Sequence, residues 1–237
     1  MAIPAPRICV LIPAFNEAGA VGRVVAEVQL CLPAATAVVV DDGSTDDTTA
    51  CALRAGATVV RLPINLGIGG AMQTGYRYAL GRGFAVCIQV DGDGQHDPAE
   101  LRRLMDPIVA GAADLVIGSR WLGRGDYVAP AGRRLGMRVL SLLLRWRTSA
   151  HLTDPTSGFR AVGSRGIELF ARSYPTDFPE VQAIALAIDA GMTVTEVPTR
   201  MRPRVQGRSS IGGLRSFYYM ARVTMSLMVE RLDGAGP

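Results

Sequence analysis

Two aspartates with one glycine between them, Asp91 and Asp93, follow directly after a short apolar run that ends at Val90. The amide of Gln95 comes two residues later. Carboxylate and amide oxygens are suitable ligands for Mg²⁺ or Mn²⁺, and a metal bound in this way commonly holds a diphosphate. Asp and Gly are also common turn residues, so a solvated acidic turn is the alternative interpretation. This stretch alone leaves both interpretations open.

Acidic residues also follow two other predicted strands. Glu17 comes after a strand predicted over residues 7–12, and Asp41 and Asp42 come after one predicted over residues 37–40. The carboxyl ends of parallel strands lie at one edge of a sheet, where open α/β sheets bind ligands. We expect Asp42 to accept a hydrogen bond from a base N–H of a nucleotide. Three acidic strand ends at one edge favour a metal and nucleotide site over an acidic turn.

The glycines at positions 67, 69 and 70 resemble part of a dinucleotide-binding fingerprint. Its third glycine would fall at Met72, and the turn follows the third predicted strand, not the first, so we disfavour a dinucleotide site. Gly69 remains a candidate nucleotide contact, because a glycine lets the backbone come close to a ligand. A plain helix start explains these glycines equally well.

The elements that must position these residues alternate along the first 120 residues. Predicted strands cover residues 7–12, 37–40, 58–62, 84–90 and 114–119. The first predicted helix covers residues 17–32. The second is capped by Thr45 or Asp46 and ends at Gly56. The third runs from the glycines at 67–70 to Leu80, and the fourth starts at Pro98 with Asp97 as its cap. This alternation predicts an α/β fold with a Rossmann-like, mostly parallel sheet flanked by helices.

The second half of the chain does not continue this regular alternation. We expect helices over residues 133–147, 163–173, 178–190 and 211–232, a turn and short strand over 153–162, a strand over 193–197 and a disordered tail over 233–237. A single domain over residues 1–232 is predicted, with a nucleotide-binding half (1–119) and a second half (120–232).

Composition excludes several kinds of chemistry. All 25 basic residues are Arg, which excludes a lysine-dependent P-loop and a Schiff base. Only His96 and His151 are histidines, too few for a three-histidine zinc site. The four cysteines are far apart in apolar runs, which predicts buried free thiols. Residues 1–119 hold 8 Arg against 12 Asp and Glu, whereas residues 120–237 hold 17 against 9, so the basic half can bind phosphate or anionic lipid.

The sequence predicts a cytoplasmic protein that is peripheral to the membrane. There is no apolar run long enough to cross a bilayer and no signal peptide pattern. The predicted helices over 133–147 and 211–232 have apolar faces flanked by Arg, which suits an interface with lipid, although packing on the core explains each helix alone. The basic segment 200–210 lacks interleaved aromatic residues, so we expect no nucleic acid partner.

Several motifs, taken in order, resemble family 2 glycosyltransferases of the GT-A fold. They are PAFNE at 13–17, VVVDDGSTDDT at 38–48, NLGIGGA at 65–71, VDGDGQH at 90–96 and GSR at 118–120. DPTSGFRA at 154–161, EVP at 196–198 and GRSSI at 207–211 are similar to the polyprenyl-phosphate branch, which includes dolichol-phosphate mannose synthase. The resemblance covers residues 6–225, and it implies that the second half, residues 120–232, binds the acceptor.

The resemblance implies a GDP- or UDP-linked hexose donor, such as a mannose or glucose donor, and a dolichyl or undecaprenyl phosphate acceptor. It assigns the nucleotide to Pro13, Ala14, Asn16, Glu17 and Asp42, and Mg²⁺ or Mn²⁺ to Asp91, Asp93 and Gln95. It places Arg120, Arg134 and Arg204 at the acceptor phosphate, with Arg133 and Arg202 as alternatives for the last two. Many relatives carry transmembrane helices that this chain lacks, so peripheral docking or a small integral membrane partner is expected.

An anionic lipid phosphate needs no general base, and direct displacement would invert the anomeric centre. A hydroxyl acceptor such as a polysaccharide would need a base, for which Asp154 and Glu180 are weak candidates. A non-catalytic nucleotide-sugar sensor or membrane scaffold is the alternative from another class, and the intact pair of Asp91 and Asp93 argues against it.

Overall fold

The computed structural model describes residues 6–122, 141, 152–176 and 179–202. Three predicted segments lie outside these residues. They are the helix over 211–232, the tail over 233–237 and, except for Ser141, the helix over 133–147. Arg133, Arg134 and Arg204 lie outside them too.

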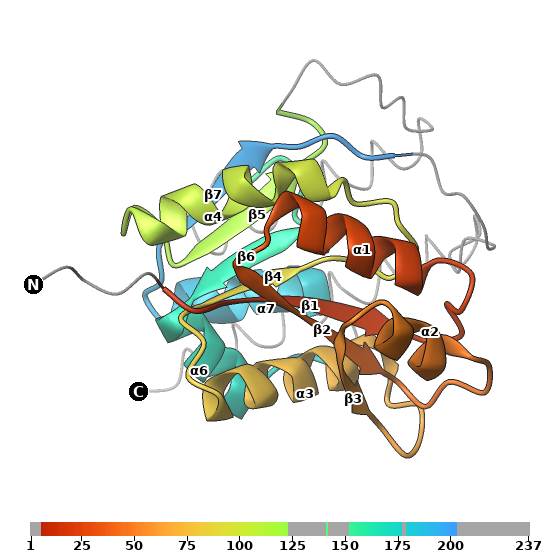
Figure 1. The fold of residues 1–237 in the computed structure, drawn as a ribbon. Coiled ribbons are helices and arrows are strands. Elements are labelled where there is room, and N and C mark those ends of the chain that lie inside the picture. The colour runs from red at the N-terminus through yellow and green to blue at the C-terminus, as the bar shows by residue number, and fades with distance from the viewer. Residues whose placement is uncertain (1–5, 123–140, 142–151, 177–178, 203–237) are drawn as a thin grey trace, which may run out of the picture.

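One sheet of seven strands forms the centre of the described part of the chain (Figure 1). Its order is β3-β2-β1-β4-β6-β5-β7. The strands are β1 (Ile8–Ala14), β2 (Ala35–Asp41), β3 (Thr58–Arg61), β4 (Val86–Gln89), β5 (Leu115–Ser119), β6 (Arg160–Gly163) and β7 (Val194–Pro198). β6 is antiparallel to both of its neighbours, β4 and β5, and the other strand pairs are parallel. The prediction of a mostly parallel sheet is confirmed.

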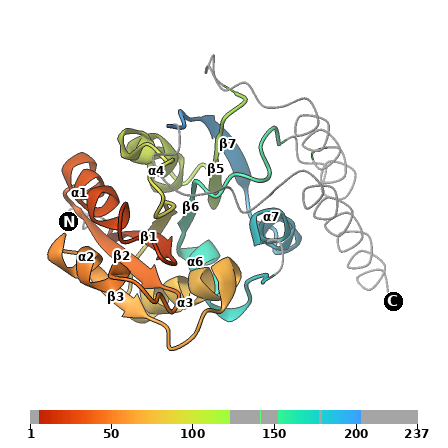
Figure 2. The ribbon, with the colours of Figure 1, turned by 90° about the vertical axis from the view of Figure 1, so that its right-hand side faces the viewer.

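Helices cover both faces of this sheet (Figures 1 and 2). α1 (Val21–Cys31), α2 (Thr48–Arg54) and α4 (Leu101–Val109) pack on one face, and α3 (Gly67–Gly81), α6 (Ser164–Arg172) and α7 (Pro179–Asp189) pack on the other. Side chains alternate along β1, so Ile8, Val10 and Ile12 join the first core and Cys9 and Leu11 join the second. The two cores hold the sheet rigid beneath its carboxyl edge.

The ends of several helices follow from particular residues. Gly56 has a φ of +85° and ends α2, as predicted, because glycine adopts this conformation without strain. Asp97 caps the turn that opens at Pro98 by accepting a hydrogen bond from the Ala99 amide, also as predicted, although the first turn, η1 (Pro98–Glu100), is a 3₁₀ helix. Asp46 accepts a hydrogen bond from the Thr48 amide at the start of α2.

The predicted helix over residues 17–32 begins only at Val21. Asn16 has a φ of +55°, and the amides of Asn16, Glu17 and Ala18 donate to side chains of the loop after β2. These bonds hold residues 16–18 in a loop, which delays the start of α1.

All four cysteines are free, as predicted, but only Cys9 and Cys87 are buried, whereas Cys31 and Cys51 are partly exposed. Among the described residues, every helix is too short or too polar to cross a membrane.

Candidate active site

The acidic ends of β1, β2 and β4 lie at one edge of the sheet, which confirms the prediction from the sequence. β1 pairs in parallel with β2 and with β4, and Ala14 lies opposite Asp41. A Cβ atom on Gly92 would lie 3.0 Å from the carbonyl oxygen of Pro13, so a side chain there would push the two loops apart. The glycine between the two aspartates therefore lets the loop after β4 approach the end of β1.

The loops after β1 and β2 are tied together by hydrogen bonds. The Asn16 amide donates to Ser44 Oγ at 2.9 Å, and Asn16 Oδ1 accepts from the Thr45 amide at 2.9 Å. The Glu17 amide donates to Thr48 Oγ1 at 2.8 Å. Two of the predicted nucleotide-binding residues, Asn16 and Glu17, are thus fixed in place by polar groups of the neighbouring loop.

Asp42 is buried and its carboxylate contacts backbone amides of this chain. Oδ1 accepts from the Leu66 amide at 2.7 Å, and Oδ2 accepts from the Gly67 amide at 2.9 Å. Burial raises the pKa of Asp42, and these two hydrogen bonds oppose that shift. Asp42 therefore fixes the start of α3, and its contact with a nucleotide base stays a prediction.

Gly69 is required by packing within the chain. A Cβ atom at this position would lie 2.4 Å from the carbonyl oxygen of Pro175, in the segment between α6 and α7. This contact explains the glycine without a ligand, and a nucleotide contact at Gly69 stays a prediction.

The loop after β4 presents its two aspartates differently. The side chain of Asp91 is 39% exposed, whereas Asp93 is buried and its Oδ1 accepts from the Gln95 amide at 2.9 Å. A Cβ atom on Gly158 would lie 3.3 Å from Asp91 Oδ1, so the glycine after β5 and before β6 leaves room beside this carboxylate. Gln95 is partly exposed in the same loop.

These donors fit a hard divalent cation. No three His, Cys, Asp or Glu side chains of the described residues converge as a complete metal cage. Mg²⁺, however, is commonly held by one or two carboxylates together with substrate phosphates. Asp91, Asp93 and Gln95 offer the donor types of such a shared site, and their role as metal ligands stays a prediction.

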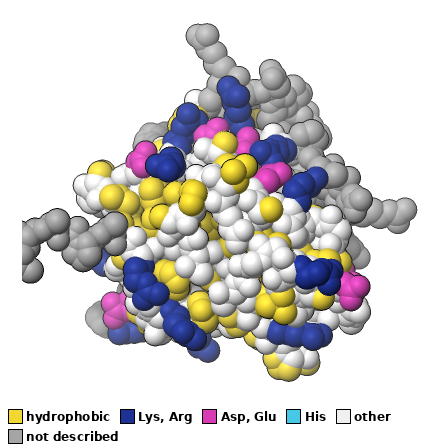
Figure 3. Space-filling view, viewed as in Figure 1, with side chains coloured by type: hydrophobic (Ala, Val, Ile, Leu, Met, Phe, Trp, Pro, Cys, Tyr) yellow, Lys and Arg dark blue, Asp and Glu magenta, His cyan; other side chains and the backbone are white. Residues whose placement is uncertain are grey.

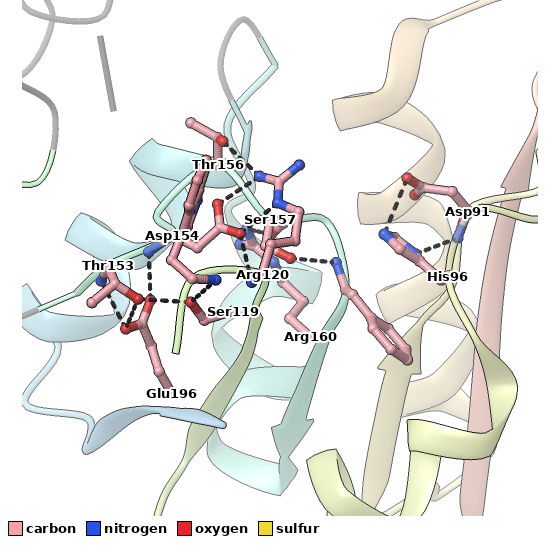
Figure 4. A network of polar contacts seen from close by, with 12 residues as sticks. Asp91, His96, Ser119, Arg120, Thr153, Asp154, Thr156, Ser157, Arg160 and Glu196 are labelled. Carbon is pink, nitrogen blue, oxygen red and sulfur yellow. Dashed lines mark hydrogen bonds and ion pairs between the residues drawn. The ribbon is translucent and has the colours of Figure 1, made fainter. Parts of the chain in front are cut away.

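His96, to which sequence reasoning assigned no role, orients Asp91. His96 Nδ1 accepts a hydrogen bond from the Asp91 amide at 3.0 Å, and Nε2 lies 3.6 Å from Asp91 Oδ2 (Figure 4). Because Nδ1 accepts, the ring proton of the neutral imidazole is on Nε2, which faces the carboxylate. The ring stacks on Phe159 with centroids 4.6 Å apart, and burial lowers the pKa of His96.

Arg120 forms a buried ion pair at the end of β5. Its Nε and Nη2 lie 2.5 Å from the two oxygens of Asp154, and Nη2 also donates to Thr156 Oγ1 at 3.1 Å. The Asp154 side chain is fully buried and the Arg120 side chain is 8% exposed. This pairing fixes the plane of the guanidinium group, and it makes Asp154 a poor general base because both of its oxygens already accept hydrogen bonds.

The TDP turn that contains Asp154 is held by Glu196 on β7. Glu196 accepts hydrogen bonds from the amides of Thr153 and Asp154, each at 2.7 Å, and from Thr153 Oγ1 at 2.9 Å. Burial raises the pKa of Glu196, although these hydrogen bonds oppose the shift. Figure 4 shows one continuous network in which the DPTSG motif, the EVP motif and the GSR motif meet.

Arg160 and Glu180 add charge behind this network. Arg160 is almost fully buried on β6 and donates to the carbonyl oxygens of Ser157 and Glu180 at 2.5 and 3.1 Å. Burial raises the pKa of Glu180, while the nearby Arg160 lowers it. The role of Glu180 as a base for a hydroxyl acceptor stays a prediction, because the hydrogen bond from Arg160 reaches its backbone carbonyl and not its carboxylate.

Comparison with known proteins agrees with this geometry. A model of the family "Glycosyl transferase family 2" matches residues 9–167. The chain is 33% identical to the polyprenol monophosphomannose synthase of Mycolicibacterium smegmatis, over 98% of this chain and 91% of that protein. It is 32% identical to the undecaprenyl-phosphate mannosyltransferase of Micrococcus luteus, over 87% of this chain and 88% of that protein.

Solved structures show the same fold. Glucosyl-3-phosphoglycerate synthase from Mycobacterium tuberculosis, crystallised with Mn²⁺, UDP and phosphoglyceric acid, matches with a TM-score of 0.71 at 21% identity, over 96% of this chain and 78% of that one. The same enzyme with Mg²⁺ and UDP matches with a TM-score of 0.69 at 23% identity, over 96% and 79% of the two chains.

Proposed function

The chain belongs to glycosyl transferase family 2 and is a glycosyltransferase of the GT-A fold, and from this premise we propose that it transfers a hexose from a nucleotide diphosphate sugar to a polyprenyl phosphate. The observation that carries the proposal is the extent of the likeness. Two relatives named for polyprenol- or undecaprenyl-phosphate mannosyl transfer align over at least 87% of this chain.

The donor is proposed to bind along the carboxyl ends of β1 and β2. Pro13 and Ala14 are the buried last residues of β1, Asn16 and Glu17 follow in the loop after it, and Asp42 supports the start of α3. A uracil or guanine base is proposed here, and UDP in the solved neighbours supports the former.

Asp91, Asp93 and Gln95 are proposed to hold Mg²⁺ or Mn²⁺ together with the donor diphosphate. A bound divalent metal supplies positive charge that stabilises the leaving nucleoside diphosphate. The neutral His96 fixes Asp91, and the Asp93 carboxylate fixes the turn at Gln95. The solved neighbours that contain Mn²⁺ or Mg²⁺ support this assignment.

The acceptor phosphate is proposed to lie on the basic side of the site, with Arg120, Arg134 and Arg204. A guanidinium group binds phosphate oxygens with a fixed fork of donors, which suits the positioning of an anionic nucleophile. A phosphate oxygen then attacks the anomeric carbon as the bond to the diphosphate breaks, so the configuration inverts. Proton removal is not needed, which agrees with the pairing of Asp154 to Arg120.

Because a polyprenyl phosphate is anchored in lipid, we propose that the protein works at a membrane surface as a peripheral protein. Its basic half provides charge complementary to anionic lipid. The relatives named for lipid phosphate acceptors support this placement. A small integral membrane partner remains an untested prediction.

The proposal is tested by incubating the protein with membranes and a panel of radiolabelled nucleotide sugars, in Mn²⁺ or in EDTA. Label should enter an organic-extractable, mild-acid-labile lipid in Mn²⁺ only. Label found only in polymer would indicate the hydroxyl acceptor instead. Lack of transfer from every donor would refute the proposed reaction.

A further inference from the structure

Arg202, an alternative to Arg204 for the acceptor phosphate, contacts two carboxylates of this chain. Nη1 pairs with Glu27 Oε2 on α1, and Nη2 lies 2.8 Å from Asp97 Oδ1 in the loop after β4. The side chain of Arg202 is 40% exposed, and those of Glu27 and Asp97 are 31% and 21% exposed. Partial burial lowers the pKa of Arg202, but ion pairing with Glu27 and Asp97 outweighs it, so the group remains charged.

The backbone joins the same two segments. The Arg202 amide donates to the carbonyl oxygen of Gln95 at 2.8 Å, and Met201 forms an antiparallel bridge with His96. The chain leaving β7 therefore runs beside residues 95–97, which begin with the proposed metal ligand Gln95. Side-chain and backbone contacts both join residues 201–202 to residues 95–97, although these segments lie about a hundred residues apart in the sequence.

The position of these contacts matters because they tie the chain after β7 to the loop that carries the proposed metal ligands. Residues 91–97 belong to the donor and metal side. Arg204, two residues after Arg202 in the sequence, is assigned to the acceptor phosphate. Figure 3 shows acidic and basic side chains close together on the upper part of this face, where α1 and α4 lie.

We propose that Arg202 is a positioning residue: with Glu27 and Asp97 it fastens the segment that leads to Arg204 onto the loop that holds Asp91 and Asp93. The inference rests on the proposed function for its consequence, but the fastening itself can be measured without substrate. Arg202 then contributes to acceptor use through its two carboxylate partners and does not bind the lipid phosphate itself.

Glu27→Gln separates this role from direct phosphate binding. If Arg202 fastens the segment, loss of the Glu27 charge weakens acceptor use in the same way as Arg202→Gln. If Arg202 instead binds the phosphate, Glu27→Gln releases the guanidinium group and leaves acceptor use unchanged or improved. Asp97→Asn is less clean, because Asp97 Oδ1 also accepts from the Ala99 amide.

The first experiment needs no substrate and so does not depend on the reaction. Hydrogen–deuterium exchange is followed in peptides that cover residues 195–202 and 93–100 of the wild type, Arg202→Gln and Glu27→Gln. Both variants should speed exchange in both peptides. Arg172→Gln is the matched control, because it breaks the exposed pair of Arg172 with Glu168 on α6 and should leave both peptides unchanged. Unchanged exchange in Arg202→Gln would overturn the proposal.

The second experiment measures the KM for polyprenyl phosphate in detergent and the Kd for UDP or GDP with Mn²⁺. Arg202→Gln and Glu27→Gln should each raise the KM about two- to five-fold, the range for partly exposed ion pairs. The Kd should change less than about two-fold, within the ordinary effect of a surface substitution. The double variant should lie close to Arg202→Gln, because the two changes share the Arg202–Glu27 pair and the other partner of Glu27, Arg23, forms only a long, exposed pair with it.

The outcomes are separable. A higher KM in Arg202→Gln with an unchanged KM in Glu27→Gln would show that Arg202 binds phosphate directly and would overturn the fastening role. Faster exchange in both variants, together with a wild type that transfers no sugar to polyprenyl phosphate, would refute the proposed function and leave the fastening intact.

Discussion

Replacement of Asp154 by Asn should destabilise the fold strongly. The Asp154 side chain is fully buried and the Arg120 side chain is 8% exposed, so the variant leaves a buried cation without its counter-charge. Breaking a buried pair in this way costs about 3–5 kcal/mol. Asn keeps the shape and one acceptor, so we expect the lower end, about 3 kcal/mol.

For a domain of this size, about 3 kcal/mol corresponds to a fall in Tm of roughly 6–12 °C. Urea unfolding followed by circular dichroism and a calorimetric scan both measure the change. Glu168→Gln is the matched control, because it removes one carboxylate from an exposed pair on α6 and should change stability by less than about 1 kcal/mol.

The same buried pair can also be tested by removing both of its charges. Arg120→Met combined with Asp154→Leu removes both charges and should recover most of the lost stability, because apolar replacement of a whole buried pair is often neutral or stabilising. Activity should stay low in the double variant. An Asp154→Asn protein within about 1 kcal/mol of the wild type would contradict the burial argument, since that is the range of an exposed pair.

Three further variants test the site. Asp93→Ala should abolish metal-dependent turnover and weaken Mn²⁺ binding in the presence of UDP or GDP, measured by calorimetry; unchanged rates would remove the metal assignment. Arg204→Ala should raise the KM for lipid phosphate more than the Kd for donor, and equal losses would count against its acceptor role. His96→Phe keeps an aromatic ring against Phe159 but removes the acceptor for the Asp91 amide, so Mn²⁺ affinity should fall about ten-fold, as outer-shell changes commonly do. Equal Mn²⁺ affinity in that variant would show that Asp91 is oriented without His96.

Much of the fold could be predicted because its signals are local. The runs that became β1, β2 and β4 are apolar and end in turn residues, and Gly56 and Pro98 mark helix ends through their own backbone preferences. The antiparallel direction of β6 was not predictable, because it depends on pairing with β4 and β5 across long sequence separations. The late start of α1 likewise depends on hydrogen bonds to a loop about 30 residues away.

In the candidate site, too, the sequence predicted what depends on strand order and did not predict which side chains are in contact. Parallel strand order places Asp91, Asp93 and Asp42 at one edge, so their proximity followed from alternation alone. What each side chain contacts did not follow. Asp154 was considered as a base and proved to be the partner of Arg120, and Arg202 was considered for phosphate and proved to contact Glu27 and Asp97. A carboxylate and a guanidinium attract each other whatever their sequence separation, so only the folded geometry selects the pairs.

The nature of the nucleophile is the central claim, and a comparison of two acceptors tests it most directly. Purified protein, Mn²⁺ and a labelled nucleotide sugar are supplied with either polyprenyl phosphate or the matching polyprenol, which carries a hydroxyl in place of the phosphate. Transfer to the phosphate alone, with one nucleoside diphosphate released for each labelled lipid, is the predicted result. Equal transfer to the alcohol would contradict the account, because a hydroxyl needs a base and gains nothing from arginines placed to hold an anion.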